Sequence, residues 1–207
     1  LIHEPMAAAL GIGIDVEEPV GNMIIDIGGG TTGITVIALA GIVCDQSIRI
    51  AGDEFTADIM EALRRYHSLL IGERTAEQIK IQVGAALKDL DNPPDDIPVN
   101  GRDLVTGIPK QVMVSYQEVA EALDKSIFKI EEAILKALET TPPELAADIY
   151  RRGLYITGGG ALLRGLEKRL ASKIKLPVHI ADDPLKSVVR GTGIALKSYD
   201  RLPFVMR

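Results

Sequence analysis

The chain contains no tryptophan and a single cysteine, and aromatic residues make up only 4% of its 207 residues. One cysteine cannot form an internal disulfide, so the fold does not depend on a disulfide framework, and this usage is typical of a reducing cytoplasm. We interpret Cys44, which lies in an apolar stretch, as a small buried hydrophobe. A chain of this length can bury a sizeable core without covalent cross-links.

Long apolar runs and excess positive charge are also absent. The longest apolar stretch, residues 36–44, is far shorter than the ~20 residues that a membrane-spanning helix needs. The net charge of −6 argues against nucleic acid as a partner and against an anionic membrane as the main one. No secretory signal is present, and the chain begins at Leu1 in mid-pattern, so we expect a fragment of a longer protein.

Several common site motifs are missing as well. No G-x-x-x-x-G-K-[ST] occurs, which excludes a P-loop, and residues 11–13 lack the third glycine of a dinucleotide fingerprint. His3 cannot begin a zinc helix, because Ala7 stands where a second histidine is required. We interpret His67 and His179 as surface or hydrogen-bonded histidines, since neither has neighbours suited to binding a ligand.

Two runs of three glycines are the most informative feature that the sequence does contain. Asp26-Ile27-Gly28-Gly29-Gly30-Thr31-Thr32 lies between two strand-like runs, and Gly158-Gly159-Gly160 follows another. Without side chains, backbone N–H groups can converge on an anion, and Asp26 closes its strand where a divalent cation on bound phosphates would sit. Either run alone could be a tight hairpin, but together they indicate a nucleotide held from two sides.

Hydrophobic periodicity predicts a layered α/β domain. The strands expected first are 22–27, 32–40 and 42–50, paired as an antiparallel meander, with weaker or later strands at 97–99, 111–114, 154–156 and 177–181. The helices expected cover residues 4–10, 55–66, 119–138, a segment ending before Gly153, 162–174, and one or two helices through 196. A further helix is expected to start with a capping box at Thr75 and to bury Ile79, Val83 and Leu87.

Four segments of the chain resemble a known family. They are Glu4-Pro5-Met6-Ala7-Ala8-Ala9, residues 26–32, residues 72–80 and Thr157-Gly158-Gly159-Gly160-Ala161-Leu162-Leu163. In this order and spacing they resemble the actin/Hsp70/sugar-kinase superfamily, and most closely the bacterial actins of the MreB family. The resemblance runs the whole length of the chain and corresponds to the C-terminal part of those proteins. It implies the second half of an actin-like ATPase fold: an RNase-H-like α/β subdomain (residues 1–52 and 117–207) with a smaller inserted α/β subdomain (residues 53–116).

The resemblance also implies a site for ATP and Mg²⁺ between two halves of the intact molecule. By resemblance, Gly28, Gly29, Gly30 and Thr31 hold the β- and γ-phosphates, and Asp26 orients the metal through its waters. Glu4 matches the acidic residue that positions the attacking water, so Glu4 and Asp26 are the expected catalytic residues. The residues expected to border the nucleoside are Glu77, Gln78, Ile79, Lys80, Gly158, Gly159, Gly160, Ala161 and Leu162.

Each of these motifs has a plainer interpretation. Glu4 could simply be a first-turn carboxylate favoured by the helix dipole, and Glu77 with Lys80 could be a surface pair three residues apart. Two positions depart from the family pattern. Gly33 stands where glutamate is usual, and Thr56 stands where aspartate follows Gly-Asp-x-Phe.

The expected function is that of a cytoskeletal protein whose ATP-dependent filaments direct cell shape and cell-wall synthesis. The resemblance implies slow ATP hydrolysis in the intact protein and an inactive isolated fragment. It also implies a cytoplasmic location on the inner face of the membrane, self-association head to tail, and partners such as RodZ and MreC. The alternatives are a kinase, for which we find no acceptor site, an Hsp70-type ATPase, which would need a peptide-binding domain beyond Arg207, and a nucleotide-free interaction module.

Overall fold

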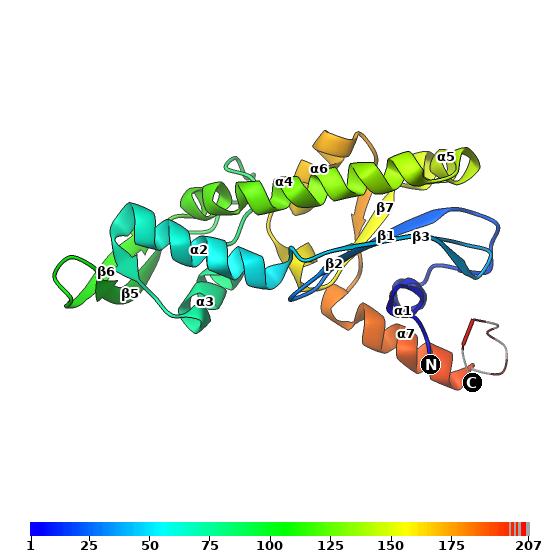
Figure 1. Cartoon of the computed structure of the whole chain (residues 1–207), viewed down its shortest axis with the longest axis horizontal. Coiled ribbons are helices and arrows are strands. Elements are labelled where there is room, and N and C mark those ends of the chain that lie inside the picture. The colour runs from blue at the N-terminus through cyan, green and yellow to red at the C-terminus, as the bar shows by residue number, and fades with distance from the viewer. Residues whose placement is uncertain (199, 201, 203, 206–207) are drawn as a thin grey trace.

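The computed structural model describes residues 1–198, 200, 202 and 204–205 (Figure 1). Its helices are α1 (Glu4–Ile12), α2 (Gly52–His67), α3 (Glu73–Val83), α4 (Tyr116–Thr140), α5 (Pro143–Arg152), α6 (Leu166–Ile174) and α7 (Ser187–Lys197), with short 3-10 helices η1 (Gly159–Leu162) and η2 (Pro184–Lys186). Its strands are β1 (Asn22–Ile27), β2 (Thr32–Ala38), β3 (Gly41–Ile48), β4 (Leu69–Leu70), β5 (Ile97–Asp103), β6 (Pro109–Val114), β7 (Leu154–Thr157) and β8 (Val178–Ile180).

A five-stranded sheet in the order β3-β2-β1-β7-β8 forms the larger part of the molecule. The first three strands are the antiparallel meander that the sequence predicts, and β7 and β8 add to β1 in parallel. Leu39 and Ala40 make the turn between β2 and β3 with positive φ angles of 50° and 56°. Because β1 and β7 are parallel, both strands end at the same edge of the sheet.

Different helices cover the two faces of this sheet, because successive side chains of β1 point to opposite sides. Ile25 and Ile27 belong to the large core cluster that also contains the buried face of α4. Ile24 belongs to a second cluster with Met6 of α1, and α1 packs against α7 on that side (Figure 1). Asp26, two residues after Ile24, therefore lies on the face that α1 covers.

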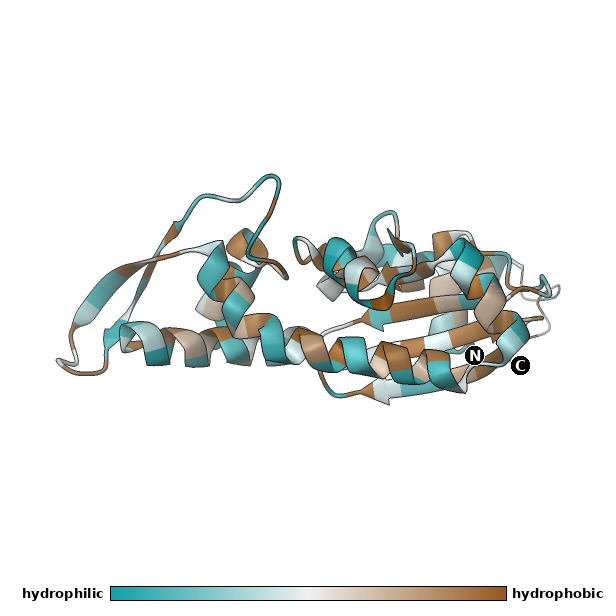
Figure 2. Cartoon of the chain, turned by 90° about the horizontal axis from the view of Figure 1, so that it is seen from above, coloured by the Kyte–Doolittle hydropathy of each residue, from teal (hydrophilic) through white to brown (hydrophobic). Residues whose placement is uncertain are grey.

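A three-stranded sheet in the order β4-β5-β6 lies at the other end of the molecule, next to α2 and α3 (Figure 1). The long helix α4 contacts α2 and α3 there and β2, β3 and α6 of the larger part. Figure 2 shows mainly apolar strands in the five-stranded sheet and an extended β5–β6 hairpin at the opposite end. The division into residues 1–52 with 117–207 and an insertion of residues 53–116 stays a prediction.

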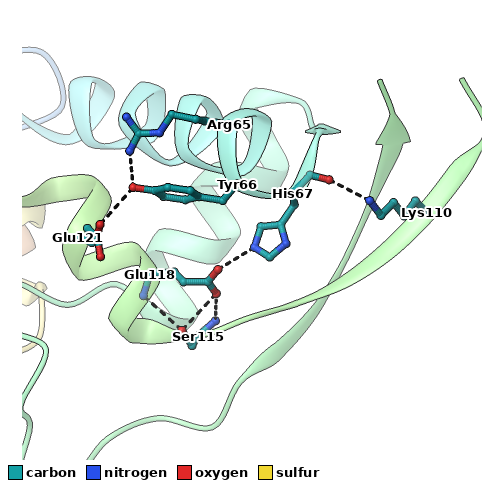
Figure 3. Close-up of polar contacts among 7 residues, drawn as sticks. All are labelled: Arg65, Tyr66, His67, Lys110, Ser115, Glu118 and Glu121. Atoms are coloured by element: carbon teal, nitrogen blue, oxygen red, sulfur yellow. Dashed lines mark hydrogen bonds and ion pairs between the residues drawn. The ribbon is translucent and has the colours of Figure 1, made fainter. Parts of the chain in front are cut away.

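Polar contacts fix the junction between the end of α2 and the start of α4 (Figure 3). The side chain of Ser115 accepts the N–H of Glu118, and Glu118 in turn accepts the N–H of Ser115, which is a capping box that the sequence analysis missed. The imidazole of His67 lies 2.7 Å from the same Glu118 carboxylate, and Lys110 of β6 donates to the His67 carbonyl at 2.9 Å. These contacts join α2, β6 and α4 at one point.

The start of α3 differs from the prediction. The capping box at Thr75 is wrong: α3 begins at Glu73, and the carbonyl of Gly72 accepts the N–H groups of Thr75 and residue 76. The same helix ends at Val83, so Leu87 lies outside it.

The helix expected over 162–174 is divided into η1 and α6. Gly165 separates them with a φ of 75°, a conformation that interrupts an α-helix. Among the described residues, none of the helices combines the length and the apolarity that crossing a membrane requires.

Candidate functional site

The two glycine loops, Gly28–Gly30 and Gly158–Gly160, lie at the shared edge where β1 and β7 end. Asp26 and Thr157 are partners in the parallel register of these strands. Gly158 has a φ of 82°, and a Cβ there would lie 2.4 Å from a carboxylate oxygen of Asp26. Only glycine fits this contact. The second loop therefore lies directly against the Asp26 carboxylate, which precedes the first glycine loop. The carboxyl edge of parallel strands is a common ligand site in α/β sheets.

The first glycine loop is a tight turn at the end of the β1–β2 hairpin. The N–H of Gly28 donates to the carbonyl of Thr31 at 3.0 Å, which closes the turn. Gly29, Gly30 and Thr31 are exposed, so their backbone and the Thr31 hydroxyl are accessible to a ligand.

Asp26 and Glu4 meet in one cleft of about 200 Å³, which Gly28 and Thr31 also line. Glu4 is exposed in the first turn of α1, followed by Pro5, whose missing N–H is tolerated at that position. Burial, and then the negative charge of Glu4, raise the pKa of Asp26 above its usual value. A carboxylate whose ionised form is disfavoured by burial and by a neighbouring negative charge is an arrangement that a cation would relieve.

The second glycine loop is held by η2 and packs on β1. The hydroxyl of Thr157 and the N–H of Gly158 both donate to the carbonyl of Pro184, at 3.0 and 3.1 Å. A Cβ on Gly160 would lie 2.2 Å from the side chain of Ile27, so this glycine is also required by close packing. Ala161 is buried beneath the loop, whereas Leu162 is 56% exposed at its rim.

The predicted α3 residues are not among those that line the cleft, although Lys80 contacts Gly52, which bonds the first loop. Gln78 is exposed, whereas Ile79 is 1% exposed and belongs to the core. Lys80 pairs with Glu77 at 2.6 Å. Burial alone would raise the pKa of Glu77, but hydrogen bonds from Lys80 and from Thr56 outweigh it and leave that pKa below its usual value.

The end of α3 reaches the segment that follows the second loop. The N–H of Ala86 donates to the carbonyl of Arg164 at 2.7 Å, and the Arg164 guanidinium lies 3.4 Å from the carbonyl of Ile81. The structure therefore brings the predicted residues into two neighbouring groups: the cleft with Glu4, Asp26 and the first loop, and the second loop with α3.

Sequence reasoning missed part of the cleft. Gly33 and Thr35 of β2 and Asp45 and Ser47 of β3 also line it, and the Thr35 hydroxyl donates to Asp45 at 2.9 Å. Period-two alternation was the available signal, because residues 33 and 35 share one face of β2. At Gly33, one of the two departures from the family pattern, a Cβ would meet nothing within 4 Å, so the missing side chain leaves open space.

The sequence matches the MreB/Mbl protein family over residues 1–203. It is 48% identical over 203 residues to the cell shape-determining protein Mbl of Bacillus subtilis, which covers 98% of this chain and 60% of that protein. It is 47% identical to the cell shape-determining protein MreB of Escherichia coli, covering 97% of this chain and 57% of that protein. The chain thus spans about 60% of the length of the curated relatives that it matches.

Solved structures agree with this match. MreB5 of Spiroplasma citri bound to AMPPNP is similar with a TM-score of 0.92 and 40% identity, covering 96% of this chain and 59% of that one. The MamK double helical filament is similar with a TM-score of 0.75 and 26% identity, covering 97% of this chain and 59% of that one. The predicted actin-like α/β fold is confirmed by these likenesses.

Proposed function

The chain belongs to the MreB/Mbl family, and we propose that it is the nucleotide-binding second half of a bacterial actin-like protein whose filaments direct cell shape and cell-wall synthesis. The observation that carries the proposal is the contact between the two glycine loops, where Gly158 lies against Asp26 at the shared edge of β1 and β7. The relatives named above as cell shape-determining proteins support the biological role.

In this proposal ATP lies along that edge. Gly28, Gly29, Gly30 and Thr31 bind the β- and γ-phosphates, and the second loop, Gly158–Leu162, borders the adenosine. Helix α3 closes the nucleoside side through Glu77 and Gln78, and Ile79 supports it from the core. The AMPPNP and ADP complexes of MreB5 of Spiroplasma citri support a nucleotide in this fold.

Mg²⁺ fits the donors that the chain offers. Asp26 carries a carboxylate whose raised pKa reflects burial and the charge of Glu4, and a cation beside it would favour the ionised form. Among the described residues, no group of three or more acidic, histidine or cysteine side chains is arranged to hold a metal. The ion would therefore be held mainly by phosphates and water, with Asp26 orienting it, and it would neutralise charge on the phosphates.

Glu4 is proposed to act on water in a slow hydrolysis. It is exposed at the mouth of the cleft that contains Asp26 and the first loop. Phosphoryl transfer needs an in-line water more than covalent assistance, and an exposed carboxylate can orient that water.

Assembly is the second part of the proposal. The β5–β6 hairpin ends in exposed apolar residues: Leu104 at 44%, Val105 at 83% and Ile108 at 62% exposure. A head-to-tail contact is heterologous and propagates without closing, so an apolar tip at one end suits it. We propose that this tip meets the next subunit, and that RodZ, MreC and the inner face of the membrane bind the intact protein in the cytoplasm.

Calorimetry and pelleting test these two parts separately. Mg-AMPPNP should bind the full-length protein tightly and the 207-residue chain weakly or not at all, because phosphate donors from both halves are needed. Full-length protein should pellet with nucleotide, and Val105→Asp should abolish pelleting while keeping nucleotide affinity. Submicromolar binding to the chain alone would contradict the half-site, and unchanged pelleting of Val105→Asp would contradict the proposed contact.

A further inference from the structure

The first glycine loop is supported by the N-terminus of α2. The N–H of Gly52 donates to the carbonyl of Gly28 at 3.1 Å, and the N–H of Asp53 donates to the carbonyl of Gly29 at 2.8 Å. Two of the unpaired N–H groups that begin any α-helix are thereby satisfied by the loop. The carbonyls of Gly28 and Gly29 both face α2 as a result.

This arrangement fixes where the loop's N–H groups point. In a planar trans peptide the C=O of one residue and the N–H of the next point in opposite directions. The N–H groups of Gly29 and Gly30 must therefore point away from α2. Neither has a hydrogen-bond partner within the part of the chain that the structure describes, and both glycines are exposed. They are two of the donors proposed above for the phosphates.

The start of α2 is itself held by Lys80 of α3. The Lys80 ammonium donates to the carbonyl of Gly52 at 2.7 Å, to the hydroxyl of Thr56 at 3.0 Å and to the carboxylate of Glu77 at 2.6 Å. These three contacts use all three protons of the ammonium. The Lys80 side chain is only 15% exposed, so its ammonium interacts mainly with the groups of this cluster.

Thr56 completes the cluster as a neutral member. Its side chain is buried, and its hydroxyl lies 2.8 Å from the Glu77 carboxylate and 3.0 Å from the Gly52 carbonyl. Thr56 is one of the two departures from the family pattern, which has aspartate there. A hydroxyl at this place leaves Glu77 and Lys80 as a balanced ion pair, whereas an aspartate would put a second carboxylate beside Glu77.

We propose that Thr56 and Lys80 are positioning residues for phosphate binding. Together with Gly52 and Glu77 they form a clamp, here called the α2 clamp, that holds the start of α2 and so aims the Gly29 and Gly30 N–H groups at the phosphates. The proposal rests on the proposed function of the first glycine loop. It gives Lys80 a role through Gly52 in place of direct contact with the nucleoside.

Thr56→Val in the full-length protein is the main test, because it removes the hydroxyl without changing charge or shape. We expect Kd for Mg-AMPPNP to rise about tenfold, as losing a buried hydrogen bond can cause, while the affinity for adenosine, which has no phosphate, stays unchanged. Hydrogen exchange at the Gly52 and Asp53 amides should become faster in the nucleotide-free protein. Thr56→Ser should restore both properties.

Two control variants remove similar groups elsewhere. Thr141 is also buried and bonds a carbonyl four residues back, so Thr141→Val tests the loss of any such hydroxyl. Lys88→Met, which breaks the exposed pair with Glu121, serves as the control for Lys80→Met. Both controls should keep the parent's AMPPNP affinity and amide exchange.

Three results would overturn the clamp: unchanged AMPPNP affinity in Thr56→Val, unchanged exchange at Gly52 and Asp53, or an equal loss of adenosine and AMPPNP affinity in Lys80→Met. The last result would show that Lys80 contacts the nucleoside itself. If the parent protein bound no Mg-AMPPNP, the proposed function would fail, and the exchange rates alone would then decide whether the clamp orients the loop.

Discussion

Asp26 is the residue on which stability and function oppose each other. Its raised pKa means that the folded chain binds this proton more tightly than the unfolded chain does. The fold therefore loses stability as the pH rises through that pKa. At neutral pH the ionised carboxylate lowers the free energy of unfolding unless a cation is bound. Residues of this kind are typical of functional sites.

Asp26→Asn should accordingly stabilise the nucleotide-free protein at pH 7 and weaken Mg-AMPPNP binding by more than about tenfold, since a hydrogen bond to a charged group is lost. Thermal unfolding at pH 7 and at pH 4 measures the first effect. The difference between variant and parent should shrink at the lower pH, because protonation of the parent carboxyl removes the buried charge. A parent that is more stable than the variant at pH 7 without nucleotide would contradict this account of Asp26.

Glu4→Gln should separate binding from chemistry. Glu4 is exposed and has its proposed role in the transition state, so Kd for Mg-AMPPNP should change by less than about threefold. Hydrolysis of ATP by the full-length protein should slow by ~10²-fold, the usual size of an acid–base contribution. Single-turnover phosphate release measures it, and release at the parent rate would remove Glu4 from the mechanism.

Residue types alone indicated only part of the site. The glycine runs and Asp26 stand out because few other roles require three glycines after a strand. The sequence does not single out Thr35, Asp45 and Ser47, because their place in the cleft follows from strand register. That register pairs Thr35 with Ile24 on one side and with Asp45 on the other. Thr56 was noticed only as a departure, and its contacts with Lys80 depend on how α2 meets α3.

Among the elements, the crossing of α1 and α7 determines where Glu4 lies. A Cβ on Gly11 would come 1.8 Å from the carbonyl of Ser187, and one on Gly191 would come 1.7 Å from the carbonyl of Ala7. The two helices thus touch backbone to backbone at these glycines. Because α1 carries Glu4 in its first turn, the packing against α7 holds this carboxylate at the cleft.

Gly191→Ala should destabilise the protein by about 1–3 kcal/mol, because the added methyl group overpacks the crossing. Gly193→Ala on the same helix is the matched control, since a Cβ there meets nothing within 4 Å. That control should stabilise the helix by roughly 0.5–1 kcal/mol. Urea unfolding of both variants measures the difference, and equal effects would show that the crossing tolerates a larger residue.

The β5–β6 hairpin has its own pH dependence. Asp103 accepts N–H groups from Thr106 and Val105 and pairs with Lys110, and these contacts lower its pKa to about 2. A lowered pKa gives stability that is present above the unfolded pKa of 3.8 and is lost as the pH falls toward 2. The hairpin that carries the exposed apolar tip should therefore loosen between these values.

Amide exchange at Val105 and Thr106 checks this expectation. Exchange at these two amides, corrected for the intrinsic effect of pH, should quicken between pH 4 and pH 2 in the parent. Asp103→Asn should remove that dependence, because an amide side chain does not titrate there. A carboxyl that titrates near 3.8 would contradict the assigned contacts.

The order of elements could be predicted from apolar periodicity, whereas several of their ends could not. The strands of the meander were predicted closely because Ile and Val runs are bounded by glycines and polar turns. The start of α3 was misplaced because Thr75 and its neighbours mimic a capping box, while Gly72 ends the preceding extended segment. The second loop was expected to open an α-helix directly, but Gly165 interrupts it with a positive φ.

At the scale of the whole molecule, the proposed site and the proposed assembly tip lie at different places on one elongated chain (Figure 1). Helix α4 contacts β2 and β3 of the larger sheet and the helices α2 and α3 beside the smaller one, and the α2 clamp joins α3 to the first glycine loop. If the proposed function holds, a nucleotide at the glycine loops would contact the first loop that α2 supports, and this contact would link the proposed nucleotide site to the helices beside the smaller sheet.

The central claim is that the two glycine loops bind one nucleotide, and selective ¹⁵N-glycine labelling of the full-length Val105→Asp variant, which should not assemble, tests it most directly. On saturation with Mg-AMPPNP, the amide resonances of Gly28, Gly29, Gly30, Gly158, Gly159 and Gly160 should shift. Gly41 at the β2–β3 turn and Gly153 before β7 should stay unchanged. If nucleotide binds while the loop glycines do not shift, or if only Gly41 and Gly153 respond, the account of the site is wrong.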